Sequence, residues 1–247
     1  MKRYILIGPL CVLGLWFAVT LTGLVDPLLL PGPVKVFAAL GRLIASQKLW
    51  VDLYRTVLRW LSGVVLGVCI GVPLGIILGY FDRAYRSFEL IIDFFRSVPS
   101  LALFPLFFVL FGLGEMSKVS VAAWATLVLL LVNTVYGVKY ARASRLRLAR
   151  LLGATTVQVF TKIVFPSALP HISAGMRVAL SIALIVTVGS EMILGGQHGL
   201  GKSIMDASFR FDMSEMYATL IVVGVIGYVA NRVFLLLEHK AIHWRGH

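Results

Sequence analysis

The sequence predicts an all-α protein that crosses a membrane several times, and two observations carry this prediction. Of its 247 residues, 59% are hydrophobic and only 14% are charged, and the mean hydropathy is +0.92. A soluble domain carries about 25% charged residues and could not hide so much apolar surface from water. The apolar residues also gather in long segments, so lipid is the expected solvent.

Six apolar segments are expected to form transmembrane helices, because each approaches the roughly 20 residues that cross a bilayer. They run over residues 4–25, 60–81, 90–114, 119–138, 172–194 and 216–237. The first has no small-residue cleavage site after it, so we expect an uncleaved helix rather than a signal peptide. We expect a single membrane domain over residues 1–247, with its core at 50–240.

The charged residues predict an orientation. The net charge is +12, and the cations gather in short polar segments rather than in a basic patch interleaved with aromatic residues, which is typical of a membrane protein and not of a nucleic-acid-binding one. The N-terminus, the loop at 139–171 and the C-terminal tail are basic, which places them in the cytoplasm. The stretch with Lys35, Arg42 and Lys48 fits this rule least, and we expect it to lie as an amphipathic helix at the outer interface.

Glycines recur every four residues along one side of the second segment. They are Gly63, Gly67, Gly71, Gly75 and Gly79. A helix side without side chains lets another helix approach closely. The pattern favours plain helix packing, and the alternative is the pore-forming interface of a helix bundle. Pro73 lies within this stripe and is expected to kink the helix.

The loop at 139–171 is basic but is not disordered in composition. Its first half predicts a helix from Arg142 to Leu152, and Gly153 is expected to end that helix in a left-handed conformation. We expect apolar contacts from the leucines of this helix, which are Leu146, Leu148, Leu151 and Leu152.

The second half of the loop carries a helix start signal. Thr155 and Gln158 stand three residues apart, which is the spacing of a capping box. Pro166 and Pro170 are expected to stop this helix before the chain re-enters the membrane. The whole loop would then form a short helical hairpin at the membrane surface, which suits a mechanical contact with a soluble partner.

The same loop resembles the cytoplasmic loop of ABC importer permeases. The family pattern is Glu-Ala-Ala, three residues, Gly, nine residues and Ile-x-Leu-Pro, and this chain has Arg147-Leu148-Ala149, then Gly153, then Ile163-Val164-Phe165-Pro166. The spacing from Gly to Ile is the same, and the residues that match by identity are Ala149, Gly153, Ile163 and Pro166. Arg147, Leu148 and Phe165 replace the family's Glu, Ala and Leu.

Further motifs extend the resemblance over nearly the whole chain, to the nitrate, sulfonate, taurine and bicarbonate class of these permeases. They are Leu30-Pro31-Gly32-Pro33, Arg96-Ser97-Val98-Pro99, Phe111-Gly112-Leu113-Gly114-Glu115, Gly153-Ala154-Thr155 and Trp244-Arg245. The resemblance implies the type I ABC importer permease fold and transport of a small anion by alternating access. Organosulfonates such as taurine are expected ahead of nitrate or bicarbonate.

The resemblance also implies the partners. The expected assembly has a second permease subunit, as a homodimer, two ATPase subunits and an external solute-binding protein, in a bacterial inner membrane. ATP and magnesium would be bound by the ATPase and not by this chain, which is expected to be no enzyme and to hold no cofactor or metal. The residues implied to couple to the ATPase are Arg147, Ala149, Gly153, Ala154, Thr155, Ile163 and Pro166.

The stretch Gly196-Gln197-His198-Gly199-Leu200-Gly201-Lys202-Ser203 fits the P-loop pattern of nucleotide-binding proteins. A working P-loop joins a strand to a helix, so that backbone amides hold the phosphates. Here the stretch follows a membrane helix and falls outside the cell in the predicted topology. We therefore interpret the match as a coincidence and expect a tight outer loop that meets the binding protein.

Ionisable residues inside the predicted spans are candidates for a gate or a pathway, because burying them in lipid is costly. Asp93 and Arg96 lie three residues apart, so they either neutralise each other as a structural pair or act near the inner gate. Arg177 lies near the cytoplasmic start of its helix, from where its side chain is expected to reach lipid headgroups.

Glu191, Asn133 and Ser190 complete the pathway candidates. Glu191 would repel an anion, so we expect a gate or structural role in which it pairs with Lys202 or Arg210. Asn133 and Ser190 could line a pore, although polar groups in lipid usually bond to neighbouring helices, and that interpretation is favoured.

The sequence shows no catalytic or metal-binding pattern. Cys11 and Cys69 lie in apolar segments as packing residues, and the histidines lack metal-ligand spacing. The alternative from another class is an ion-coupled secondary transporter or a channel, for which inverted repeats would be typical, and none is clear here. A third interpretation, an intramembrane enzyme, lacks the reactive polar cluster that it would need.

Overall fold

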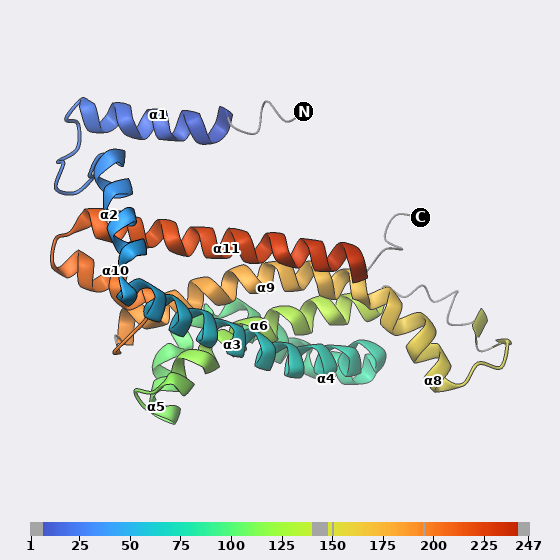
Figure 1. Ribbon diagram of the computed structural model, residues 1–247. Coiled ribbons are helices and arrows are strands. Elements are labelled where there is room, and N and C mark those ends of the chain that lie inside the picture. Colours follow the sequence, from blue (N-terminus) through green and yellow to red (C-terminus); the bar gives the residue numbers. More distant parts are fainter. Residues whose placement is uncertain (1–6, 140–147, 150, 195, 242–247) are drawn as a thin grey trace. The chain divides into compact units, whose positions relative to one another are not determined.

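The computed structural model describes residues 7–139, 148–149, 151–194 and 196–241. Within these residues the chain forms helices and turns without a strand (Figure 1), so the predicted all-α class is confirmed. The elements are α1 (Ile7–Leu21), α2 (Pro33–Ala45), α3 (Gln47–Tyr80), α4 (Asp82–Ser97), η2 (Ser100–Leu103), α5 (Phe104–Phe111), α6 (Glu115–Lys139), α8 (Thr156–Val159), η3 (Phe160–Val164), α9 (Phe165–Leu194), α10 (Leu200–Phe209) and α11 (Met213–Ala241).

The helices that could cross a membrane are fewer than the predicted six. Over the described residues, 4 helices are long and apolar enough, or up to 5 if a bent pair counts as one span. The 4 are Gln47–Tyr80, Glu115–Lys139, Thr156–Ile193 and Met213–Lys240. The described part of the first predicted segment is α1, whose 15 residues are fewer than the roughly 20 that cross a bilayer.

The predicted single helix over 90–114 is wrong. The chain breaks between α4 and the run from Ser100 to Phe111, and the two parts are bent by 93°. Val98 is extended, with φ −80° and ψ 122°, because the ring of the following Pro99 disfavours the helical conformation there. This bent pair is the fifth candidate span.

The described chain divides into two compact units, one from Met1–Thr56 with Glu191–Ile226 and the other from Val57–Ser190 with Gly227–His247. The first has a small core of Val36, Ala39 and Ala218. There α2 packs on the start of α11, and Tyr217 lies beside Trp16 of α1 with ring centroids 6.5 Å apart. The expectation of a single membrane domain stays a prediction.

In the second unit the glycine side of α3 lies directly against α6. A Cβ atom added at Gly63 would lie 2.6 Å from the Cβ of Ala122, and one added at Gly75 would lie 2.6 Å from the Cβ of Thr134. The other three glycines also face α6, and they are Gly67, Gly71 and Gly79. Since real Cβ atoms do not approach this closely, any side chain here would push the helices apart. The stripe therefore packs two helices of the same chain.

Gly75→Ala is expected to destabilise the protein by about 1–3 kcal/mol, because the new methyl group would force α3 away from α6. The measurement is thermal unfolding of the purified protein in detergent. Gly224→Ala is the matched control, since a Cβ at Gly224 of α11 meets nothing within 4 Å. Equal stability of the two variants would contradict backbone contact through the glycine side.

Candidate functional site

The segment implied to couple to an ATPase begins, in the described residues, at Leu148. Gly153 has φ +75°, and the Ala154 N–H donates to the Ala149 carbonyl at 3.0 Å. These are features of a helix end closed by a left-handed glycine. Arg147 and most of the predicted helix from 142 to 152 lie outside the described residues.

The next residues form the predicted helix start. The Thr155 hydroxyl accepts from the Gln158 N–H at 3.3 Å, and the Gln158 side chain accepts from the Thr155 N–H at 3.0 Å. Both hydrogen bonds of a capping box are therefore present. They satisfy two backbone donors at the start of α8, which fixes where this helix begins.

The expectation that Pro166 and Pro170 stop this helix is wrong. The run Thr156–Ile193 is one helical span of 38 residues, and α8 continues through η3 into α9 at the right of Figure 1. The reason is a wide π-helical turn, in which the Phe165 N–H bonds the Phe160 carbonyl five residues earlier. Such a turn accommodates a proline, which has no N–H to offer and whose ring needs room. Ile163 lies in this turn and Pro166 directly follows it at the start of α9.

The base of this coupling segment, which we define as 148–164, is anchored inside its own unit. Val159 and Val164 are buried with Val138 of α6 and Ala168 of α9, and Ala149 and Ala154 pack against the same cluster. α6 and α9 also touch closely at Gly137, where an added Cβ would lie 2.8 Å from the Cβ of His171. The segment is therefore fixed to two membrane helices.

The outer part of the coupling segment exposes apolar side chains. Leu151 is 84% exposed and Leu152 is 78% exposed, and Val157 is 70% exposed. Leu148 is exposed as well, and Leu146 lies outside the described residues. The described leucines do not form the core of this segment, which the valines and alanines below them supply. The apolar contacts expected of the leucines stay a prediction. Exposed apolar side chains that are grouped in this way are typical of a surface that meets a protein partner or a membrane.

A second site lies in the first unit, and it is polar. Side chains there cap the N-terminus of α10. The Gly199, Leu200 and Gly201 N–H groups donate to Asp52, Thr56 and Glu191 respectively, each at 2.9 Å. The Thr56 hydroxyl donates to the Glu191 carboxylate at 2.9 Å, and Ser203 donates to Asp52 at 2.7 Å. Asp52 and Glu191 are buried, and carboxylates at a helix N-terminus are stabilised by its unpaired N–H groups and dipole.

This cap removes the nucleotide-binding interpretation of the P-loop-like stretch. The backbone N–H groups that would bind phosphates in a P-loop donate their hydrogen bonds to side-chain oxygen atoms of this chain instead. A phosphate placed there would meet the carboxylates of Asp52 and Glu191, which repel it. Lys202 pairs with Asp206 at 2.6 Å and Arg210 with Glu215 at 3.0 Å, so neither is the contact that holds the Glu191 carboxylate in the cap.

The remaining pathway candidates lie in the second unit. Asn133 donates to the Leu129 carbonyl of its own helix at 2.8 Å, and Gly175 of α9 packs on its side chain. The Nε of Arg177 lies 3.4 Å from the buried Glu238 carboxylate, and its side chain is 35% exposed, so contact with lipid headgroups stays a prediction. Ser190 is buried and donates to a carbonyl within α9 at 2.7 Å.

Of the two interpretations given for Asp93 and Arg96, the structural ion pair is not formed among the described residues. Both line a small cavity of about 10 Å³ between α4 and α6, together with Tyr85 and Tyr136. They share this cavity without an ion pair between them in the described residues. A gating role for Arg96 stays a prediction.

Sequence reasoning missed the polar face at the start of α3. Arg59 is buried, and its Nη2 donates to the Glu115 carboxylate at the start of α6 at 2.7 Å. Asp52, Thr56 and Arg59 follow one another at helical spacing, so one face carries all three. This spacing was the available signal, but the predicted span began at residue 60 and left these residues in a loop.

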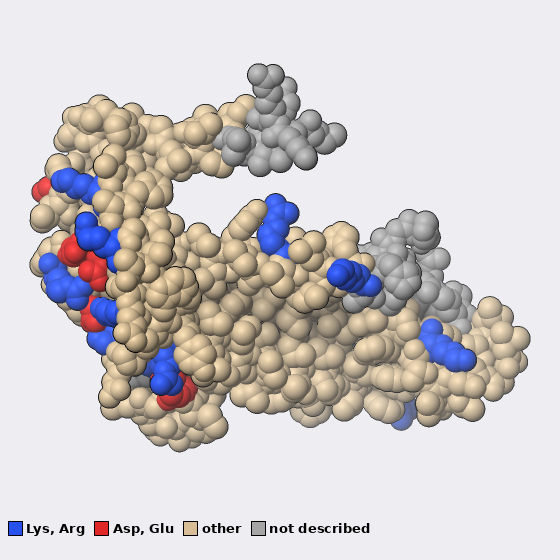
Figure 2. Space-filling view, viewed as in Figure 1, with Lys and Arg blue, Asp and Glu red and all other residues tan. Residues whose placement is uncertain are grey.

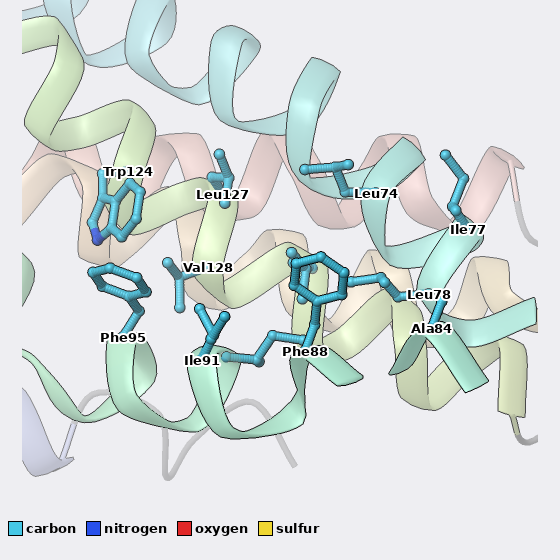
Figure 3. Close-up of a pocket in the computed structure, with 12 residues that line it drawn as sticks. Leu74, Ile77, Leu78, Ala84, Phe88, Ile91, Phe95, Trp124, Leu127 and Val128 are labelled. Atoms are coloured by element: carbon cyan, nitrogen blue, oxygen red, sulfur yellow. The ribbon is translucent and has the colours of Figure 1, made fainter. Parts of the chain in front are cut away.

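An apolar cavity of about 470 Å³ lies between α3, α4 and α6. Figure 3 shows Leu74, Phe88 and Leu127 directed into it from three helices, and Phe95 meets the Trp124 ring edge-on with centroids 5.0 Å apart. Its lining offers no charged partner to an anion. This cavity is therefore not a site for a charged solute.

Comparisons with known proteins point to one family. The sequence model described as binding-protein-dependent transport system inner membrane component matches residues 71–243. The putative aliphatic sulfonates transport permease protein SsuC of Bacillus subtilis is 31% identical over 240 residues, covering 97% of this chain and 87% of that protein. The taurine transport system permease protein TauC of Escherichia coli is 30% identical over 246 residues, covering 97% of this chain and 89% of that protein.

Solved structures support the same fold. The inward-facing MetNI methionine ABC transporter has a chain that superposes with a TM-score of 0.65 at 19% identity, covering 82% of this chain and 100% of that one. A chain of an amino acid ABC transporter with histidines superposes with a TM-score of 0.58 at 17% identity, covering 78% and 93% of the two chains. At these identities the likeness is one of fold alone.

Thr56→Val is expected to destabilise the protein by about 1–3 kcal/mol, because it leaves the buried Leu200 N–H without its acceptor while keeping the side-chain volume. The measurement is thermal unfolding in detergent. Thr219→Val is the matched control, since the buried Thr219 hydroxyl donates only to a carbonyl of its own helix. A smaller loss for Thr56→Val than for the control would show that the cap does not stabilise α10.

Proposed function

The chain belongs to the family of binding-protein-dependent transport system inner membrane components, and we propose that as a homodimer it forms the pathway for a small organic anion in a bacterial plasma membrane. Members of this family are multi-pass membrane subunits of ABC importers. They are not catalytic, and ATP hydrolysis belongs to a separate ATPase subunit that works with a solute-binding protein. ATP and magnesium accordingly belong to the partner in this proposal.

The proposed solute class is the organosulfonates. Two relatives that cover nearly the whole chain are named for aliphatic sulfonates and for taurine, and this supports the proposal. Nitrate and bicarbonate rank behind them. The apolar cavity of Figure 3 takes no part in holding such a solute.

The proposed orientation places both termini and the coupling segment in the cytoplasm. The basic residues around the coupling segment and in the C-terminal tail support it, since cytoplasmic loops of membrane proteins carry an excess of Lys and Arg. The chain crosses the membrane along α9 and returns along α11, so the connection that carries α10 faces outward in this proposal.

The observation that carries the proposed mechanism is the continuity of the helical span from Thr156 to Ile193. A force on the exposed tip at Leu151 to Val157 is delivered directly to a membrane helix, with no loose loop between them. Gly153 and Thr155 shape the turn at the tip, and Ala149 and Ala154 pack on the base of the segment. Ile163 and Pro166 lie where the segment joins α9. ATP binding and loaded binding protein would then favour different arrangements of the helices, as alternating access requires.

Transport by the complete complex tests the proposal directly. The permease, its ATPase and its binding protein are reconstituted in liposomes, and uptake of labelled taurine is measured with and without ATP. The expected result is uptake that needs all three components and ATP. Uptake by the permease alone would contradict an ATP-driven importer.

Val157→Asp is expected to reduce the amount of ATPase subunit that co-purifies with the permease about tenfold, because it places a charge where an apolar side chain meets the partner. Val157 is 70% exposed, so the fold of the permease itself should not change. The measurement is quantitative co-purification in detergent. The matched control is Leu24→Asp, which adds the same charge at an exposed apolar residue in the α1–α2 connection. If the Val157→Asp variant retained a normal amount of ATPase subunit, the proposed contact between the coupling segment and the ATPase would be contradicted.

A further inference from the structure

We propose that α2 and the turn between α10 and α11 form the docking surface for an acidic lobe of the solute-binding protein. The inference rests on the proposed function, because it needs this end of the chain to face outward. It adds a location on the chain, the residue types that carry the contact and the charge of the partner. Three separate observations support the proposal: a groove, the balance of charges in it and a strained aromatic residue beside it.

The surface is hollowed into a groove of about 460 Å³ within the first unit. Arg42 and Ser46 line it from the end of α2, Lys48 from the start of α3, and Arg210 and Glu215 from the α10–α11 turn. Figure 2 shows basic and acidic side chains gathered over this part of the chain, at the left of the view. The chain thus has a polar concave surface large enough to accept side chains of another protein.

The acidic residues of the groove are already used by the fold. Glu215 accepts from Arg210 at 3.0 Å, and the Asp212 carboxylate accepts from the Glu215 N–H at 3.0 Å at the start of α11. Arg42 and Lys48 are exposed, and neither forms an ion pair with any described residue. The groove therefore presents two cations that are open to carboxylates from outside.

An exposed aromatic residue stands beside the groove in a strained conformation. Phe211 has φ +56°, a value that favours glycine, and it occupies the position where a glycine usually closes a helix. The Asp212 N–H donates to the Ala207 carbonyl and the Phe211 N–H to the Ser208 carbonyl, both at 3.0 Å, which is the bonding of that helix end. Phe211 is 65% exposed and Phe209 is 72% exposed, so the strained turn holds aromatic rings outward instead of burying them.

This combination favours a protein partner over lipid. Exposed aromatic side chains and arginines beside a groove are the residue types that dominate protein interfaces. The groove carries both signs of charge, and a protein surface can place carboxylates opposite Arg42 and Lys48 and hydrogen-bond donors opposite Asp212 and Glu215, which a single phosphate headgroup cannot do. The family depends on a binding protein, which has to meet the outward-facing end.

The test measures ATP hydrolysis by the complete transporter in nanodiscs while its purified, taurine-loaded binding protein is titrated in. The double variant Arg42→Glu with Lys48→Glu is expected to need about tenfold more binding protein for half-maximal stimulation, because each change replaces an attraction by a repulsion. The matched control is Lys35→Glu on α2, an exposed cation outside the groove, which should leave the titration unchanged. Equal titrations for the double variant and the wild type would overturn the proposal.

Two further arms separate the alternatives. The titration is repeated in phosphatidylcholine alone and in an equal mixture with phosphatidylglycerol, and an effect seen only in the anionic mixture would assign the cations to lipid and overturn the proposal. Phe211→Asn keeps a residue that tolerates the left-handed conformation but removes the ring, so a normal fold with weakened stimulation is expected. A wild-type transporter that no concentration of binding protein stimulates would overturn the proposed function itself.

Discussion

The second unit depends on backbone contact between α3 and α6 along the glycine side of α3. In lipid, apolar side chains gain little by leaving the solvent, so helices associate through close packing and hydrogen bonds. Each glycine from Gly63 to Gly79 places the α3 backbone where a side chain would clash with α6. α6 also meets α9 at Gly137 and at Asn133. The contact between α3 and α6 therefore also positions α9, the helix into which the coupling segment continues.

Buried hydrogen bonds join parts of the first unit that lie far apart in the sequence. Burying Asp52 and Glu191 would be costly without partners, and the amides of Gly199 and Gly201 supply them at 2.9 Å. The same bonds fix the glycine-rich connection at the start of α10. A stretch that matches a nucleotide-binding loop thereby donates its backbone N–H groups to two carboxylates of the same chain, Asp52 and Glu191, instead of to a phosphate.

Local signals in the sequence predicted local structure, and long-range partners could not be predicted. Gly153, Thr155 and Gln158 specify their turn and cap by chemistry within a few residues. Glu191 instead meets Thr56, 135 positions away, and no spacing rule connects them. The left-handed conformation of Phe211 is local but was also missed, because a phenylalanine does not predict a positive φ and the surrounding hydrogen bonds impose it. Pro166 misled because a wide turn five residues long removed the clash on which its stop signal depends.

The π-helical turn η3 is a place where the coupling segment could bend instead of moving α9. A proline after such a turn leaves carbonyls without their usual donors, and this is where helices bend. Val159 before the turn and Val164 at its end are both buried in the same cluster with Val138 and Ala168. Bending at η3 would separate Val159 from Val164, whereas moving the span together with α6 leaves the cluster intact. The packing therefore favours transmission of a push on the exposed tip to α9 over absorption of the push at the joint.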